Sequence, residues 1–320
     1  MKTVILFSML AALSLPIQGV DAAIDLYQHG KFQEAASVLS GLIRQNPEDA
    51  NLHTWRGKTY LKQHCWDDAV LEFEKAVEID PKNSLNHLWL ARACGKKAEH
   101  AFFGSAFTLA RRTRKEFETA AQLSPGNVDI RFDLLEFYVQ APWVVGGGKG
   151  KAEAQAREIA KLSPRHGYTA RAEIYEHSQD WGRARAELTE ATLKFPRDAD
   201  AYADLAGFLL RRGDLEQAEA AARQAVSLAG SNHEARLCLA RAQVELHRNV
   251  SDALKDLQDL AVGPLTEDDP EFGDVYYWLG RAYLTQGQQA EARVAFEASI
   301  RYDPDHAKSK DALAQIRQIP

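Results

Sequence analysis

The sequence predicts an all-α solenoid of stacked antiparallel helix pairs, and three observations support that fold class. A short residue recurs about every 34 positions, replaced once by leucine: Ala23, Gly57, Ala91, Leu135, Ala172, Ala206, Ala240 and Gly280. The same offsets follow in each unit, as Gly57 is followed by Trp66, Ala69, Phe73, Ala76 and Pro81. No segment shows the alternation of a half-buried strand. A fixed period of this length is typical of helix pairs that bury their apolar faces against their neighbours.

The composition excludes several other classes of protein. The 320 residues are 45% hydrophobic and 26% charged, which is typical of a globular chain. The net charge of −6 argues against a protein built to hold nucleic acid. Three cysteines are too few for a disulfide scaffold.

The amino terminus resembles a secretory signal peptide, which we place at residues 1–22 with cleavage after Ala22. Lys2 precedes the apolar run from Val4 to Leu15, and a small-residue pattern ends at Ala22. The run is shorter than the roughly 20 residues of a membrane span and is broken by Pro16. We therefore expect a periplasmic or secreted protein. A retained segment that tethers the chain to the inner membrane is the alternative.

Each element of the solenoid follows from the repeat. A short residue at the conserved offset allows the two helices of a pair to approach closely. Residues spaced i, i+3, i+4 and i+7 give the second helix its buried face. Pro81, Pro125, Pro164, Pro196 and Pro304 are expected to end helices. The predicted units are 23–47, 50–81, 84–125, 128–164, 165–196, 199–230, 233–265 and 273–304, followed by a capping helix at 306–319.

The motif residues resemble the tetratricopeptide repeat. They include Trp89-Leu90-Ala91, Gly57-x2-Tyr60 and Trp278-Leu279-Gly280-x2-Tyr283, each followed by an Ala-x3-aromatic or aliphatic step. The resemblance implies a right-handed superhelix of about eight repeats whose concave groove binds other proteins. The family's best-known groove clamps a terminal carboxylate with Lys and Asn. This chain has Thr54 and Lys58 at those positions.

Three units are longer than 34 residues. The first insertion carries Phe102 and Phe103, predicted as an apolar projection on extended helices, and then a basic run at residues 111–115. That run is either a solvated helix face or a site for an anionic partner. The third departure, residues 249–274, is expected to be a longer loop.

The second insertion is rich in glycine, from Ala141 to Lys151. Val145 stands where a Walker loop requires Gly, Ala152 replaces its hydroxyl residue, and no strand precedes it, so nucleotide binding is not expected. We expect a shaped loop with Trp143 and Val144 packed on the body, and the same loop is a candidate contact element. The stretch looks like one in a subgroup of exported bacterial repeat proteins.

The repeat register predicts the groove. The residue after each short residue, and the one four before it, should point inward. The charged set is Lys58, Arg92, Glu136, Glu173, Arg241 and Arg281, and the apolar set is Leu88, Phe132, Leu237 and Tyr277. We expect basic ends, an acidic middle and an apolar floor that holds an extended peptide or a helix.

Catalytic and metal chemistry find little support in the sequence. His64, Cys65, Cys94 and His100 cluster loosely but lack a metal-ligand spacing, so no metal site is assigned. After export, Cys65 and Cys94 would be free to pair, whereas Cys238 fits a buried helix position. No nucleophile motif is present.

We therefore expect a binding protein, not an enzyme, with no cofactor. Its role would be a scaffold or assembly factor for proteins or peptides of the cell envelope, with no nucleic acid partner and with membrane contact only through a retained N-terminal segment. The alternative is a protein that binds a metal or small ligand at the His/Cys end or the Gly-rich loop.

Overall fold

The computed structural model describes residues 19–316, and within that range the chain is entirely helical. The first half contains α1 (Val20–Gln28), α2 (Phe32–Gln45), α3 (Ala50–Lys62), α4 (Trp66–Ile79), α5 (Ser84–Glu99), α6 (Phe103–Leu123), α7 (Val128–Gln140), the 3₁₀ helix η1 (Trp143–Val145) and α8 (Lys149–Leu162). The second half contains α9 (Pro164–His177), α10 (Trp181–Lys194), α11 (Ala199–Arg212), α12 (Leu215–Leu228), α13 (His233–Glu245), α14 (Val250–Val262), α15 (Phe272–Thr285), α16 (Gln289–Tyr302) and α17 (Ala307–Ile316).

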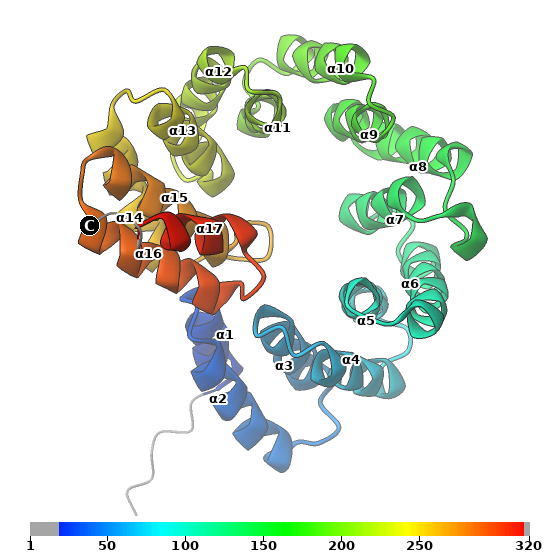
Figure 1. Ribbon diagram of the computed structural model, residues 1–320. Coiled ribbons are helices and arrows are strands. Elements are labelled where there is room, and N and C mark those ends of the chain that lie inside the picture. Colours follow the sequence, from blue (N-terminus) through cyan, green and yellow to red (C-terminus); the bar gives the residue numbers. More distant parts are fainter. Residues whose placement is uncertain (1–18, 317–320) are drawn as a thin grey trace, which may run out of the picture.

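The helices form eight antiparallel pairs and a capping helix, as the repeat predicts. Each odd-numbered helix up to α15 is the first of a pair, and helices such as α5, α7, α11 and α13 line the inner side of a ring (Figure 1). Pro164 differs from the expectation because it is the first residue of α9, where its missing N–H costs nothing. Only Ser163 separates α9 from α8.

Close packing within a pair depends on the short residue, as expected. A methyl group added to Gly57 would lie 2.7 Å from the ring of Phe73, and one added to Gly280 would lie 2.6 Å from the ring of Phe296. Both rings are fully buried. The aromatic side chain of the second helix therefore fills the space that the glycine of the first leaves open.

Six of the eight pairs share one turn between their two helices. The residue seven positions after the short residue has a left-handed backbone, at Gly30, His64, Gln179, Gly213, His247 and Gly287. The next residue donates its N–H to a carbonyl five positions earlier, as Cys65 does to Tyr60 at 2.9 Å. The exceptions are the third and fourth pairs, which carry the first two insertions.

Side-chain caps fix the start of most inner helices. Asp49, Asn83, Asn127, Asp198 and Asn232 each accept a hydrogen bond from a backbone N–H in the first turn of the following helix. These caps satisfy donors that the helix itself leaves unpaired.

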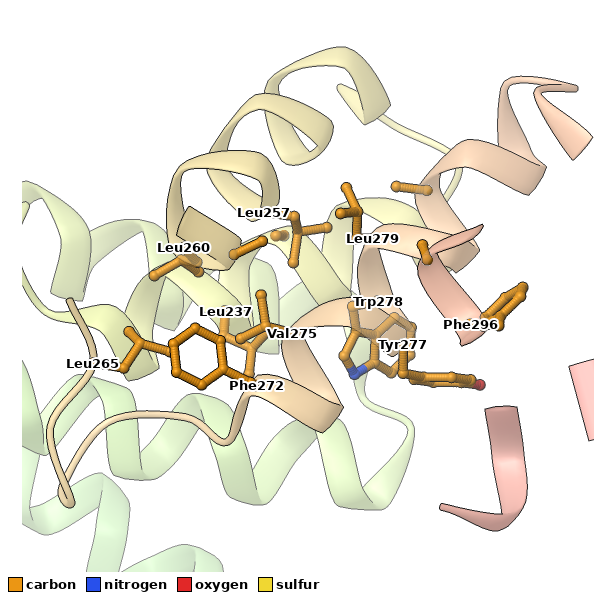
Figure 2. Close-up of a cluster of buried hydrophobic side chains, with 14 of the residues drawn as sticks. Leu237, Leu257, Leu260, Leu265, Phe272, Val275, Tyr277, Trp278, Leu279 and Phe296 are labelled. Atoms are coloured by element: carbon orange, nitrogen blue, oxygen red, sulfur yellow. The ribbon is translucent and has the colours of Figure 1, made fainter. Parts of the chain in front are cut away.

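The chain closes on itself, because the first pair packs against the last. The ring of Phe32 contacts those of Phe272 and Tyr302 at centroid distances of 6.3 and 6.1 Å. The N–H of Leu265 donates to the carbonyl of Gln28 at 2.8 Å. Figure 1 shows α1 and α2 beside α15 and α16. The largest buried cluster lies at this seam and includes Phe272, Val275 and Trp278 (Figure 2).

The predicted signal peptide lies almost wholly outside the described residues. The helix α1 begins at Val20, two residues before the predicted cleavage at Ala22, and Ala23 is buried. No helix within residues 19–316 is long and apolar enough to cross a membrane.

Candidate functional site on the inner face

The inner helices of the second to fourth pairs wall a cavity of about 890 Å³. Helices α3, α5 and α7 contribute Lys58, Trp89, Arg92 and Glu136, and the loop before α15 contributes Glu267 from the far end of the chain. The volume is in the range of pockets that hold small molecules or short peptide segments. The cavity therefore depends on ring closure, since one of its walls comes from the seam.

Tryptophan and a cation alternate along this inner surface. The Lys58 ammonium lies 4.1 Å from the centre of the Trp55 ring and 4.6 Å from that of Trp89. The Arg92 guanidinium lies 4.6 Å from the Trp89 ring. Because each cation is three residues after a tryptophan on its own helix, the two side chains share one face. Such stacking fixes the cation and presents an aromatic edge to the cavity.

Two of the predicted groove cations already have carboxylate partners. Lys58 donates to Glu267 at 2.7 Å, and Arg92 donates from Nη2 to Asp133 at 3.1 Å. Burial lowers the pKa of Lys58, an effect that the attraction of Glu267 only partly offsets. A ligand that uses these cations must compete with the protein's own carboxylates.

Two other predicted cations have no carboxylate partner in the described part of the chain. Arg241 donates to the carbonyl of Leu210 at 3.5 Å and lies over Trp278, and Arg281 donates to the Tyr277 hydroxyl at 3.0 Å. Their positive charge is therefore uncompensated locally. They are the inner-face cations most open to an anionic group.

The acidic middle is formed by Glu136 and Glu173. Burial raises the pKa of Glu136, and the charge of Asp133 raises it further. Burial likewise raises the pKa of Glu173, with a second contribution from Glu136. A cationic ligand group near either carboxylate would favour its charged form.

The predicted apolar floor is wrong for three of its four residues. Leu88, Leu237 and Tyr277 are buried in the core. Their position on the helix faces the inner helix of the neighbouring pair, as the bond from Thr54 to Asn86 of the next unit at 3.1 Å illustrates. Phe132 is half-buried, with its ring against His166. The ring of Trp89 lines the cavity instead.

The insertions carry exposed apolar side chains. Phe102 and Phe103 are each 92% exposed, as predicted for a projection. Trp143 is 83% and Val144 49% exposed, so the expectation that they pack on the body is wrong; Val145 is the buried residue of η1. The short 3₁₀ turn holds only one of the three side chains inward.

The Gly-rich loop has no free phosphate cradle. The N–H groups of Gly146, Gly147 and Gly148 donate to the carbonyls of Trp143, Pro142 and Tyr138 at 3.0, 3.2 and 2.8 Å. Lys151 donates to the carbonyl of Gly146 at 2.8 Å. The donors that would hold an anion are already used within the loop.

The His/Cys end is an aromatic stack. Trp66 lies between the rings of His64 and His100, at centroid distances of 4.8 and 5.5 Å. No three His, Cys, Asp or Glu side chains within residues 19–316 come together as metal ligands. Cys65, Cys94 and Cys238 are free thiols, and burial raises the pKa of Cys94 to about 11.

The sequence interpretation gave no role in the site to Trp55, Glu267 or Glu271, whereas pairing of the groove charges with Asp133 was an open alternative. The tryptophans had a readable signal, since Trp-x-x-Lys or Trp-x-x-Arg recurs at residues 55–58, 89–92 and 278–281. The two glutamates had none. They are brought to α3 by ring closure, with Lys62 donating to Glu271 at 2.6 Å.

The family is shown by matches across the chain. Residues 20–84 and 169–235 match one tetratricopeptide repeat model, and residues 273–306 match another. The chain belongs to the tetratricopeptide repeat family. Its fold is that of this family, whose members are helical scaffolds that bind other proteins or peptides and are generally non-catalytic.

This chain matches only part of the length of the similar proteins. The Hsp70-Hsp90 organizing protein 1 of Glycine max is 25% identical over 206 residues, which are 63% of this chain and 34% of that protein. This chain thus spans about a third of that curated relative.

Solved structures show the same fold at low identity. The yeast Tom70 structure has a TM-score of 0.62 at 16% identity, covering 99% of this chain and 66% of that one. The human IFIT1 dimer with m7Gppp-AAAA has a TM-score of 0.51 at 17% identity, covering 92% of this chain and 71% of that one.

Proposed function

We propose that this repeat protein is an exported scaffold or assembly factor that binds an extended peptide segment of an envelope protein along its inner face. The observation that carries the proposal is the cavity of about 890 Å³ between α3, α5, α7 and the loop before α15. The ring of Trp89 supplies apolar contact there, and charges of both signs surround it.

The charge order along the inner face supports a defined direction of binding. Arg241 and Arg281 carry positive charge without a carboxylate partner, whereas Glu136 and Glu173 form an acidic zone. A peptide with an acidic group and a basic group at matching separation would fit one register. Charge pairs of this kind set orientation and partner choice more than affinity.

The small-ligand alternative has weaker support. The glycine N–H groups are occupied, and Trp66 separates His64 from His100. The exported location rests on the signal-like segment at residues 1–22. N-terminal sequencing of protein recovered from the envelope fraction checks it, with Ala23 as the expected first residue.

Peptide-array binding tests the inner face. The protein is compared with R241E/R281E and with the matched control R157E/R301E, which inverts two exposed arginines on the second helices α8 and α16. We expect the inner-face variant to lose binding to acidic peptides by about tenfold or more, since each charge contact is worth about 0.2 to 1 kcal/mol and inversion adds repulsion. The control should bind as the wild type does. Equal binding by all three proteins would exclude these arginines from the site.

A further inference from the structure

The connection between α5 and α6 forms an exposed apolar tip. Phe102 and Phe103 are almost fully exposed, and Phe107 is exposed one turn later. Helix α6 has 21 residues, whereas the second helices of the other pairs have 13 or 14. Alignment of Phe117 with Phe73 places the extra residues at the start of α6. At 1.5 Å per residue they lengthen the helix by about 10 Å toward this tip.

The two insertions share one rim of the ring. In a stack of antiparallel pairs, the turns between first and second helices all lie at the same edge. The third and fourth pairs are neighbours, and only these two lack the left-handed turn that the other six use. The η1 segment, with exposed Trp143 and Val144, contacts α6. Phe102 and Phe103 of the third pair and Trp143 and Val144 of the fourth therefore lie along the same rim, and we call these four exposed apolar side chains the rim patch.

The rim patch is surrounded by positive charge in a protein of net charge −6. Residues 96–115 contain six Lys and Arg against one Glu, and four of these six pair with carboxylates. Lys149 and Lys151 follow η1, with Glu153 on the same helix. Phe103, Phe107, Arg111 and Lys115 lie four residues apart along one face of α6. Arg111 stacks near Phe107 at 5.8 Å, and neither it nor Lys115 pairs with a carboxylate among residues 19–316.

We propose that the rim patch docks the ring on the surface of an anionic lipid bilayer. Exposed aromatic side chains insert at the level of the headgroups, and Arg and Lys one to three turns away meet the lipid phosphates. The patch projects outward, which suits a bilayer better than a concave partner groove. Membrane contact then does not depend on the N-terminal segment, and the inner face stays open to a peptide.

A local probe separates this docking from any membrane binding by the N-terminal segment. The full chain and W143F are mixed with vesicles of phosphatidylcholine alone or with about 30% phosphatidylglycerol, each carrying brominated acyl chains that quench inserted tryptophan. Subtracting the fluorescence of W143F from that of the unchanged full chain gives the emission of Trp143. We expect this emission to be quenched on the anionic vesicles and little changed on the neutral ones.

Two variants and a control assign the contact. F102S/F103S should reduce the binding that quenches Trp143 by about tenfold or more, because each buried Phe contributes strongly to transfer from water. R111Q/K115Q should reduce it by about fivefold for each charge lost. L71S/V294S removes two apolar side chains that are exposed on other second helices, and should bind as the wild type does.

Two results would overturn the proposal. The first is vesicle binding without quenching of Trp143, which would place the membrane contact elsewhere in the chain. The second is absence of vesicle binding together with a protein partner that F102S/F103S fails to hold, which would make the rim patch a protein interface. Circular dichroism of each variant confirms that the helices are retained.

Discussion

At the residue scale, a few short side chains and caps fix the repeat. The rings of Phe73 and Phe296 fill the space above Gly57 and Gly280, so the two helices pack closely in each of these two pairs. The caps at Asp49, Asn83, Asn127, Asp198 and Asn232 start the inner helices. Both features follow from local chemistry, which is why the register of the sequence predicted the helix pairs so closely.

The contact of Gly57 with Phe73 gives a stability prediction. Gly57→Ala should destabilise the protein by about 1 to 3 kcal/mol, because the added methyl meets a rigid buried ring. Gly182→Ala, in α10 with open space around its Cα, should be neutral or slightly stabilising. Urea unfolding of both variants measures the difference. Equal midpoints for the two would mean that the pair relaxes at no cost.

The acidic middle of the inner face predicts a pH dependence. Burial and Asp133 raise the pKa of Glu136, so the folded chain binds this proton more tightly than the unfolded chain does. Protonated Glu136 therefore stabilises the folded chain, and this contribution is lost as pH rises from the unfolded pKa of about 4.3 through the raised folded value. Since Gln resembles the protonated acid, Glu136→Gln should raise Tm at pH 7 by about 1 °C. The shift is small because the side chain, although partly desolvated by its neighbours, still contacts water.

Thermal unfolding near pH 4 is the control for Glu136→Gln. Below the unfolded pKa both states carry the proton, and the difference between variant and wild type should vanish. A stabilisation that is the same at both pH values would assign the effect to something other than this carboxyl.

At the element scale, the connections distinguish this chain from a generic array. Six turns are built alike around a left-handed residue, and the two that differ lie side by side and carry the exposed Phe and Trp side chains. The Gly-rich loop uses its N–H donors within itself, so its glycines serve the path of the chain. The composition of the first insertion predicted that it projects, whereas Trp143 and Val144 of the second were expected to pack on the body. The sequence could not say which of the three successive apolar residues in η1 turns inward.

At the scale of the whole molecule, ring closure is the deciding feature. Repeats normally contact only their neighbours. Here the first pair packs on the last through Phe32, Phe272 and Tyr302, and Lys58 reaches Glu267 across 209 positions of sequence. The seam adds a wall to the cavity and places carboxylates beside two cations of the inner face.

A charge swap tests the seam. Lys58→Glu places two carboxylates together in a mostly buried contact and should destabilise the protein by about 1 to 3 kcal/mol, with an increase in the radius of gyration. Lys58→Glu with Glu267→Lys should restore most of both. Small-angle scattering and urea unfolding measure the two effects. If Lys58→Glu alone leaves size and stability unchanged, the aromatic contacts hold the ring without this pair.

The sequence by itself determined the fold class and the number of helix pairs. These depend on local periodicity, capping and short-range packing, which neighbouring residues encode directly. Only the tertiary structure decided that Leu88, Leu237 and Tyr277 are core residues, that Glu267 and Glu271 reach α3, and that the ring closes. Ring closure depends on the total of the small rotations between successive pairs, and the sequence of a single repeat does not determine that total.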